Sequence, residues 1–218
     1  MTTSGCRRRP HATRGRIVTA AGKLFASRGF SGVGMRDIAT KAGVSLQMPN
    51  HHFGSKEKLF GECVRYALLE CMDFPAIFAD APVFADARAA RERIAEKIRA
   101  CFFAIHPPSG QRSWCGDILG RALTENLRDA LRAFQDGLKP AREWFYPALK
   151  HIRPEMTPTE LLLWYGSLWA QVSFFSTARV AILARLGKKR YDPAFLRDAA
   201  DHLVYVMRIQ LENGRSER

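Results

Sequence analysis

Residues 36–60 read RDIATKAGVSLQMPNHHFGSKEKLF, and this stretch from Arg36 to Phe60 decides the fold. Two short helical patterns are joined by Gly43, and a further helix follows Gly54 and Ser55. A glycine after a helix adopts the left-handed backbone conformation that allows a sharp turn. Two helices joined in this way are typical of a helix-turn-helix, whose second helix enters the major groove of DNA. Double-stranded DNA is therefore the first partner to consider.

The apolar spacing around this stretch predicts the helices of an N-terminal domain. We expect them over residues 15–28, 35–42, 46–53 and 56–72. Gly34 is a weak N-cap for the second helix, whereas Ser45 and Ser55 are well suited to cap the third and the fourth. If Ser45 is the cap, Pro49 is the first residue whose N–H would bond back inside the third helix. An irregular start of that helix is therefore expected.

The rest of the chain is also predicted to be helical. Apolar residues at helical spacing predict further helices over residues 86–103, 115–124, 127–149, 159–186 and 193–212. The segment from Gly137 to Pro140 is a candidate break within the third of these. No segment shows the alternation of a strand, and no internal repeat is found. The sequence therefore predicts an all-α protein with a disordered basic arm over residues 1–13 and a helix-turn-helix domain over residues 14–60.

The positive charge is concentrated at the N-terminal end of the chain. The 218 residues carry a net charge of +13. Residues 1–60 hold 11 Lys/Arg and 2 Asp/Glu, or +9, which leaves only +4 for residues 61–218. A basic quarter joined to a nearly balanced body indicates a polyanion-binding module attached to a different kind of domain.

Cysteine usage and hydropathy indicate a cytoplasmic protein. The five cysteines are odd in number and widely spaced, so a zinc site or disulfide framework is not expected, and we interpret them as reduced, buried thiols. The N-terminus lacks the apolar segment of a secretory signal. Residues 161–178 carry no charge, but their glycine, glutamine, threonine and serines favour a core or interface helix over a membrane span.

The third predicted helix and its flanks supply the candidate DNA contacts. Amide side chains such as Gln47 and Asn50 bond an adenine edge bidentately, apolar ones touch thymine methyl groups, and cations meet phosphates. Arg14 and Arg16 are candidates for phosphate or the minor groove. The complete predicted set is Arg14, Arg16, Arg36, Lys41, Ser45, Leu46, Gln47, Met48, Asn50, His51, His52 and Lys56.

On these residues the chain resembles the tetracycline-repressor (TetR) family. The matching positions lie within residues 14–60 and comprise Ile17, Ala21, Leu24, Phe25, Gly29, Phe30, Arg36 to Ala39, Ala42 to Ser45 and His52 to Leu59. The chain departs from the family pattern at Val33, Gly34, Gln47, Pro49 and Asn50. The groove contact is thus better supported than the identity of the base-reading residues.

The resemblance implies a homodimer that binds a palindromic operator and is released by a small-molecule effector. Residues 61–218 would form the effector-binding and dimerisation domain, with two C-terminal helices per subunit in an intersubunit four-helix bundle. The predicted interface residues are Leu168, Val172, Phe175, Leu203 and Met207. The predicted pocket residues, which suggest an apolar or aromatic effector, are Phe102, Phe103, Trp114, Trp144, Tyr146, Gln171 and Phe174.

Two other classes of function compete with a ligand-released repressor. One is a ligand-independent DNA-binding regulator or activator, which would have a filled C-terminal domain. The other is an enzyme with a basic surface. The sequence contains no glycine-rich phosphate loop, nucleophile elbow or metal-spaced set of His, Cys and carboxylate residues. We therefore expect no enzymatic activity, cofactor or metal.

Overall fold

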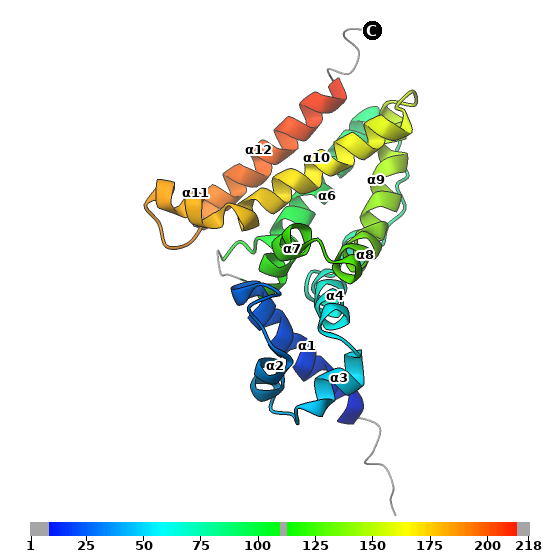
Figure 1. Cartoon of the computed structure of the whole chain (residues 1–218). Coiled ribbons are helices and arrows are strands. Elements are labelled where there is room, and N and C mark those ends of the chain that lie inside the picture. Colours follow the sequence, from blue (N-terminus) through cyan, green and yellow to red (C-terminus); the bar gives the residue numbers. More distant parts are fainter. Residues whose placement is uncertain (1–8, 110–112, 213–218) are drawn as a thin grey trace, which may run out of the picture. The chain divides into compact units, whose positions relative to one another are not determined.

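The computed structural model of the chain describes residues 9–109 and 113–212 (Figure 1). These residues hold helices and no strand, which confirms the all-α prediction. The chain divides into two compact units. Unit 1 comprises Met1–Cys71 and Trp114–Gly137, and unit 2 comprises Met72–Ser113 and Leu138–Arg218.

Unit 1 contains the predicted helix-turn-helix segment. Its helices are α1 (Arg9–Arg28), α2 (Met35–Ala42), α3 (Gln47–Phe53), α4 (Lys56–Tyr66), the π-helix η1 (Ala67–Cys71), α7 (Trp114–Glu125) and α8 (Arg128–Gly137). Helix α1 packs against α2, α4 and α7, while α4 also contacts α3 and α8 (Figure 1). The sequence did not indicate that α7 and α8 complete this unit. Their contacts join residues far apart in the chain.

The core of unit 1 forms where α1 meets α4. Phe25 and Phe60 are fully buried, with ring centroids 5.0 Å apart in an edge-on arrangement. Helices α4 and α8 approach closely at Gly61, where a Cβ atom would lie 2.8 Å from the carbonyl oxygen of Asp129. Only glycine fits this crossing without displacing the backbone of α8.

Helix α1 begins earlier than predicted. Residues 9–13 belong to α1, so the part of the predicted arm that the structure describes is helical. Proline at the second position of a helix removes an N–H that has no partner within the helix, so Pro10 is compatible with this start. The remainder of the arm, residues 1–8, lies outside the described residues.

One prediction about the cysteines was wrong. Cys71, at the end of η1, and Cys115, in the first turn of α7, form a disulfide. Their Cα atoms are 6.6 Å apart although 44 residues separate them in the sequence. Cys63 and Cys101 are free and buried, as expected. The pairing depends on the packing of α7 beside η1, which residue spacing does not reveal.

Unit 2 is built from the remaining helices. They are α5 (Phe74–Ile77), α6 (Ala87–Ile105), α9 (Lys139–Ile152), α10 (Pro158–Thr177), α11 (Arg179–Leu186) and α12 (Pro193–Glu212). Helix α6 packs against α9 and α12, and α12 also contacts α10. The candidate break near Gly137 is confirmed, since α8 ends there and α9 begins at Lys139. The predicted helix over residues 159–186 is divided into α10 and α11 at Ala178.

Aromatic side chains fill the interior of unit 2, and the polar atoms of Trp164 and Tyr165 find backbone partners. Trp164 donates its indole N–H to the carbonyl of Met207 at 3.2 Å, and Tyr165 donates to that of Leu138 at 2.9 Å. His106 is 5% exposed, with Nε2 2.9 Å from the carbonyl oxygen of Val172. Burial lowers the pKa of His106 to about 4, even though the bond to Val172 acts in the opposite direction. None of the helices in the described ranges has the length and apolar character needed to cross a bilayer.

Candidate nucleic-acid interface

The turn between α2 and α3 has the predicted geometry. Gly43 adopts the left-handed conformation, with φ 63° and ψ 44°, and its N–H donates to the carbonyl of Thr40 at 3.1 Å. The N–H of Val44 donates to Ala39 at 3.1 Å, so carbonyls at the end of α2 are satisfied. At the start of α2, the Asp37 carboxylate accepts from the N–H of Gly34 at 2.9 Å. That bond compensates for the absence of a capping side chain on the glycine.

The N-terminus of α3 is irregular, and Ser45 is not its cap. The cap position is Leu46, which makes no side-chain bond, and the helix begins at Gln47. The carbonyl of Ser45 accepts from the N–H of Met48 at 3.0 Å, in a tighter turn than an α-helix would make. Pro49 is then the third residue of α3, where no N–H bonds within the helix. The proline therefore costs α3 no hydrogen bond.

The outward face of α3 carries most of the predicted base-reading residues. Leu46, with 49% of its surface exposed, contributes an apolar side chain to this face. Met48 and His52 are half-buried, whereas Pro49 and Phe53 are buried beneath the helix. The exposed residues are Ser45, Leu46, Gln47, Asn50 and His51. Hydrogen-bonding groups beside an apolar side chain are the chemistry that reads base edges in a major groove.

Two of the predicted cations on α2 are free to meet a phosphate. Arg36 and Lys41 are exposed, and neither is bonded or ion-paired to any residue within the described ranges. A third cation, Lys23 on α1, is also exposed and was not predicted. It lines a shallow depression together with Arg16 and Lys41. Its position seven residues after Arg16, or two helical turns, is a sequence signal that could have identified it.

Three of the predicted DNA-contacting cations are bonded within the protein, namely Arg14, Arg16 and Lys56. Arg14 forms a 2.8 Å ion pair with Glu62. Burial alone would raise the pKa of Glu62, but bonds and charges from Arg65 and Arg14 outweigh burial and lower this pKa. Lys56 donates to the carbonyls of Phe30 and Val33 at 3.0 and 3.1 Å, and its ammonium lies 4.1 Å from the centroid of the Phe30 ring.

Arg16, on α1, is hydrogen-bonded to the turn of the helix-turn-helix. Its Nη2 donates to the carbonyls of Ala42 and Gly43 at 2.6 and 2.7 Å, and its Nε donates to the carbonyl of Ala42 at 3.1 Å. These carbonyls belong to the end of α2, where the helix supplies no N–H donors to its last carbonyls and its dipole attracts a cation. The guanidinium thus holds the turn against α1, in addition to any contact that it makes with DNA.

The predicted effector residues lie in different surroundings. Trp114 belongs to unit 1, where its ring stacks on Tyr66 with centroids 6.0 Å apart. In unit 2, Phe102 and Trp144 are buried in the core, and Phe174 is 54% exposed. The other three, which are half-buried, are Phe103, Tyr146 and Gln171. A groove between α6 and α12 in unit 2 is lined by other residues.

The predicted dimer-interface residues belong mainly to the core of the protomer. Four of the five side chains are at most 2% exposed in the single chain, and Phe175 is half-buried. Side chains already enclosed by their own protomer offer no surface to a partner, which corrects the prediction. The four buried residues are Leu168, Val172, Leu203 and Met207.

Comparisons with known proteins agree with this architecture. Residues 17–63 match the family described as "Bacterial regulatory proteins, tetR family". Over this segment the chain is similar to the DNA-binding domain of the TetR family. The relatives that share this segment are transcriptional regulators, which favours regulation over the enzymatic alternative.

Two characterised TetR relatives share only the DNA-binding segment. The transcriptional activator FasR of Mycolicibacterium smegmatis is 43% identical over 47 residues, which are 22% of each chain. The transcriptional repressor KstR2 of Mycobacterium tuberculosis is 38% identical over 55 residues, or 25% of this chain and 28% of KstR2. The match thus spans about a quarter of either relative, so it carries no conclusion about their C-terminal parts.

Solved structures extend the likeness of fold to almost the whole chain. A transcriptional regulator from Pseudomonas aeruginosa PAO1 is 19% identical, with a TM-score of 0.66 covering 95% of this chain and 94% of that one. FadR from Bacillus subtilis, solved in complex with stearoyl-CoA, is 17% identical, with a TM-score of 0.59 over 87% and 96% of the two chains. At these identities the likeness shows the TetR fold and nothing about ligands.

Proposed function

We propose that this protein is a DNA-binding transcriptional regulator of the TetR family that reads its operator with α3. The observation that carries the proposal is the exposed face of α3, on which Gln47, Asn50 and His51 lie beside Leu46. The exposed cations Arg36 and Lys41 on α2 stand where phosphate contacts are expected in a helix-turn-helix. We place this activity in the cytoplasm, where bacterial DNA is accessible.

The protein acts as a homodimer on a palindromic operator in this proposal. Two recognition helices must lie about 34–36 Å apart to reach successive major grooves, which a two-fold symmetric dimer provides. Exposed apolar side chains on α10 and α12 are better interface candidates than the buried residues named above. They include Leu162, Leu163 and Phe174 on α10, which are 62%, 64% and 54% exposed, and Tyr205 on α12, which is 61% exposed. Large exposed apolar side chains commonly mark a protein contact.

We further propose that the regulator is a repressor released by a small molecule. KstR2 is a repressor and FadR binds stearoyl-CoA, which supports repression and an effector, respectively. FasR is an activator, so activation or ligand-independent regulation is the alternative. An effector releases the operator only if it has different affinities for the DNA-bound and free conformations of the dimer.

The test begins with selection of bound fragments from the source genome, followed by fluorescence anisotropy on the selected duplex and a scrambled one. We expect Asn50→Ala to reduce the preference for the selected duplex about 10-fold or more, because a bidentate base contact is lost. Gln210→Ala, which removes an exposed amide from α12, is the matched control and should leave binding unchanged. Equal affinity of the unaltered protein for both duplexes would overturn the proposal.

A further inference from the structure

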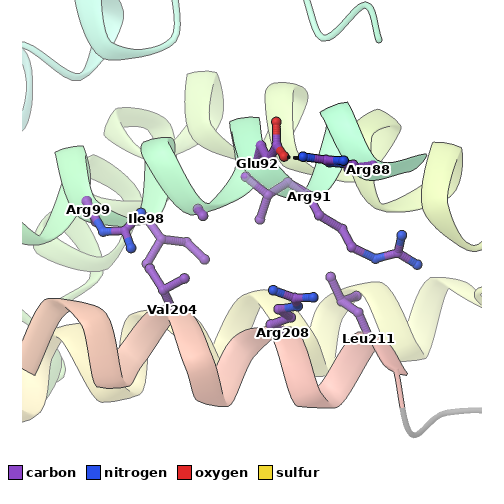
Figure 2. Close-up of a pocket in the computed structure, with 10 residues that line it drawn as sticks. Arg88, Arg91, Glu92, Ile98, Arg99, Val204, Arg208 and Leu211 are labelled. Atoms are coloured by element: carbon purple, nitrogen blue, oxygen red, sulfur yellow. Dashed lines mark hydrogen bonds and ion pairs between the residues drawn. The ribbon is translucent and has the colours of Figure 1, made fainter. Parts of the chain in front are cut away.

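A groove between α6 and α12 in unit 2 combines an apolar floor with a cationic rim (Figure 2). Its volume is about 440 Å³. The lining side chains come from both helices and are Arg88, Arg91, Glu92, Ile94, Ala95, Ile98, Arg99, Val204, Arg208 and Leu211. A pocket of a few hundred cubic ångströms suits a small organic ligand.

Three of the four arginines of the groove are already paired with carboxylates. Arg88 pairs with Glu92 at 3.0 Å, Arg99 with Asp201 at 2.8 Å and Arg208 with Glu212 at 2.8 Å. These pairs are largely exposed, and an exposed ion pair is weak enough to be exchanged for another anion. The rim therefore has cationic groups that a ligand can recruit at little cost.

Arg91 differs from the other three arginines. Its side chain is half-buried, and its Nε is buried without a hydrogen-bond partner. It forms no ion pair with any residue in the described ranges. A buried guanidinium N–H without an acceptor is unfavourable, and a carboxylate or phosphate supplies the acceptor that it lacks. In Figure 2, Arg91 from α6 and Arg208 from α12 both extend into the space between the helices.

The floor of the groove is apolar. Ile94, Ile98 and Leu211 line it and are 3%, 1% and 4% exposed, while Ala95 and Val204 are half-buried. An alkyl chain or another apolar group lying on these side chains would be removed from water, which is favourable in proportion to the area covered. The groove thus offers separate places for an anionic head and an apolar tail.

We infer that this groove binds an anionic amphiphile, with its carboxylate or phosphate on Arg91 and its apolar tail along Ile94, Ile98 and Leu211. Arg208, on the opposite helix, faces the same head group. The inference deepens the proposed function and rests on it in one respect, namely that the bound molecule acts as the effector. Ligand binding itself does not depend on that function.

Isothermal titration calorimetry of the full chain tests the binding step without DNA. Dodecanoate and dodecyl phosphate, each below its critical micelle concentration, should bind with one molecule per chain. Dodecanol and inorganic phosphate should each bind at least about 10-fold more weakly, because each lacks one half of the interaction. Comparison of the two amphiphiles shows which anionic head the groove prefers.

Variants locate the site. Arg91→Gln should weaken dodecanoate binding about 10- to 100-fold, as expected for the loss of a charged hydrogen bond. Ala95→Phe should abolish binding by filling the groove, and circular dichroism melting checks that both variants fold. Arg197→Gln removes an exposed arginine of α12 that does not line the groove, and it should leave affinity unchanged.

Three results would overturn the inference. The first is equal affinity for dodecanoate and dodecanol, and the second is unchanged affinity in both Arg91→Gln and Ala95→Phe. The third is a change of oligomeric state in these variants, with no ligand bound to the unaltered protein, which would assign the groove to a contact between copies. If ligand binds but no duplex is preferred, only the proposed function fails. If a duplex is preferred and no amphiphile binds, only this inference fails.

Discussion

Replacing Arg16 by glutamine distinguishes a structural role of this residue from direct contact with DNA. The guanidinium donates to the carbonyls of Ala42 and Gly43, so it holds the end of α2 against α1. If that is its main role, Arg16→Gln should destabilise the helix-turn-helix and leave the number of phosphate contacts unchanged. If Arg16 instead binds phosphate, the number of phosphate contacts should fall.

The expected loss of stability follows from the bonds. Charged hydrogen bonds contribute about 1.5–3 kcal/mol when shielded from water, and a cation at a helix C-terminus adds about 0.3–1 kcal/mol. Because Arg16 is exposed, solvent reduces both contributions. We therefore expect Arg16→Gln to lower the free energy of unfolding by about 1–2 kcal/mol, which corresponds to about 2–8 °C in melting temperature.

The assay combines thermal melting with the salt dependence of operator binding. Each phosphate contact contributes about 0.9 to the slope of log K against log salt concentration. Lys41→Gln is the matched control, because Lys41 is exposed and is not bonded to any residue in the described ranges. It should reduce the slope by about 0.9 per chain with no change in melting temperature. Arg16→Gln should lower the melting temperature and leave the slope unchanged.

A reversal of these two patterns would refute the reasoning. If Arg16→Gln melts like the unaltered protein and its slope falls by about 0.9 per chain, the guanidinium leaves the α2 carbonyls and binds phosphate. If Lys41→Gln leaves the slope unchanged, the exposed cations of α2 do not face DNA. Melting in the absence of DNA ensures that the change in stability is not caused by weaker binding.

Three further predictions concern stability. Below pH 6.5 the unfolded chain protonates His106, whereas the folded site stays neutral down to about pH 4. The free energy of unfolding should therefore fall by about 1.4 kcal/mol per pH unit across that range. Urea titrations at several pH values should show a flatter pH profile for His106→Gln. Gly61→Ala should lower the free energy of unfolding in urea by about 1–3 kcal/mol, because the new Cβ would meet Asp129. Gly15→Ala, with open space around it, should instead stabilise α1 by about 0.5–1 kcal/mol. Similar values for the two variants would contradict the close α4–α8 crossing. Replacing Cys71 and Cys115 together by alanine should cost up to about 4 kcal/mol in the chain-entropy model for a separation of 44 residues, and an unfolding midpoint unaffected by reductant would count against the bond.

Features set by neighbouring residues were predictable from the sequence. The bounds predicted for α2, residues 35–42, are those observed, because the apolar spacing and Gly43 act within a few residues of each other. Pro49 also signalled the irregular start of α3, although the adjustment moved the cap from Ser45 to Leu46. A proline restricts only its immediate neighbours, so its effect can be read locally.

Features that depend on distant partners were not predictable in this way. The bonds from Arg16 join residues 26 and 27 positions apart, and the disulfide joins residues 44 apart. The uncharged residues 161–178, which include Leu168, indicated a helix of the core or of an interface. Periodicity does not say whether a given face meets the same protomer or another one, so buried core residues were assigned to the dimer interface.

The disulfide also bears on how this protein could be shortened or recombined. Cys71 is the last residue of the first segment of unit 1, and Cys115 is the second residue of the segment in which the chain returns. Residues 72–113 are therefore an insertion whose two ends lie close together, with Cα atoms of the flanking cysteines 6.6 Å apart. A linker of about two to four residues would span that distance. Such a linker, combined with ending the chain at Gly137, would turn unit 1 into a portable DNA-binding module, to which another sensory domain could be joined at the same position.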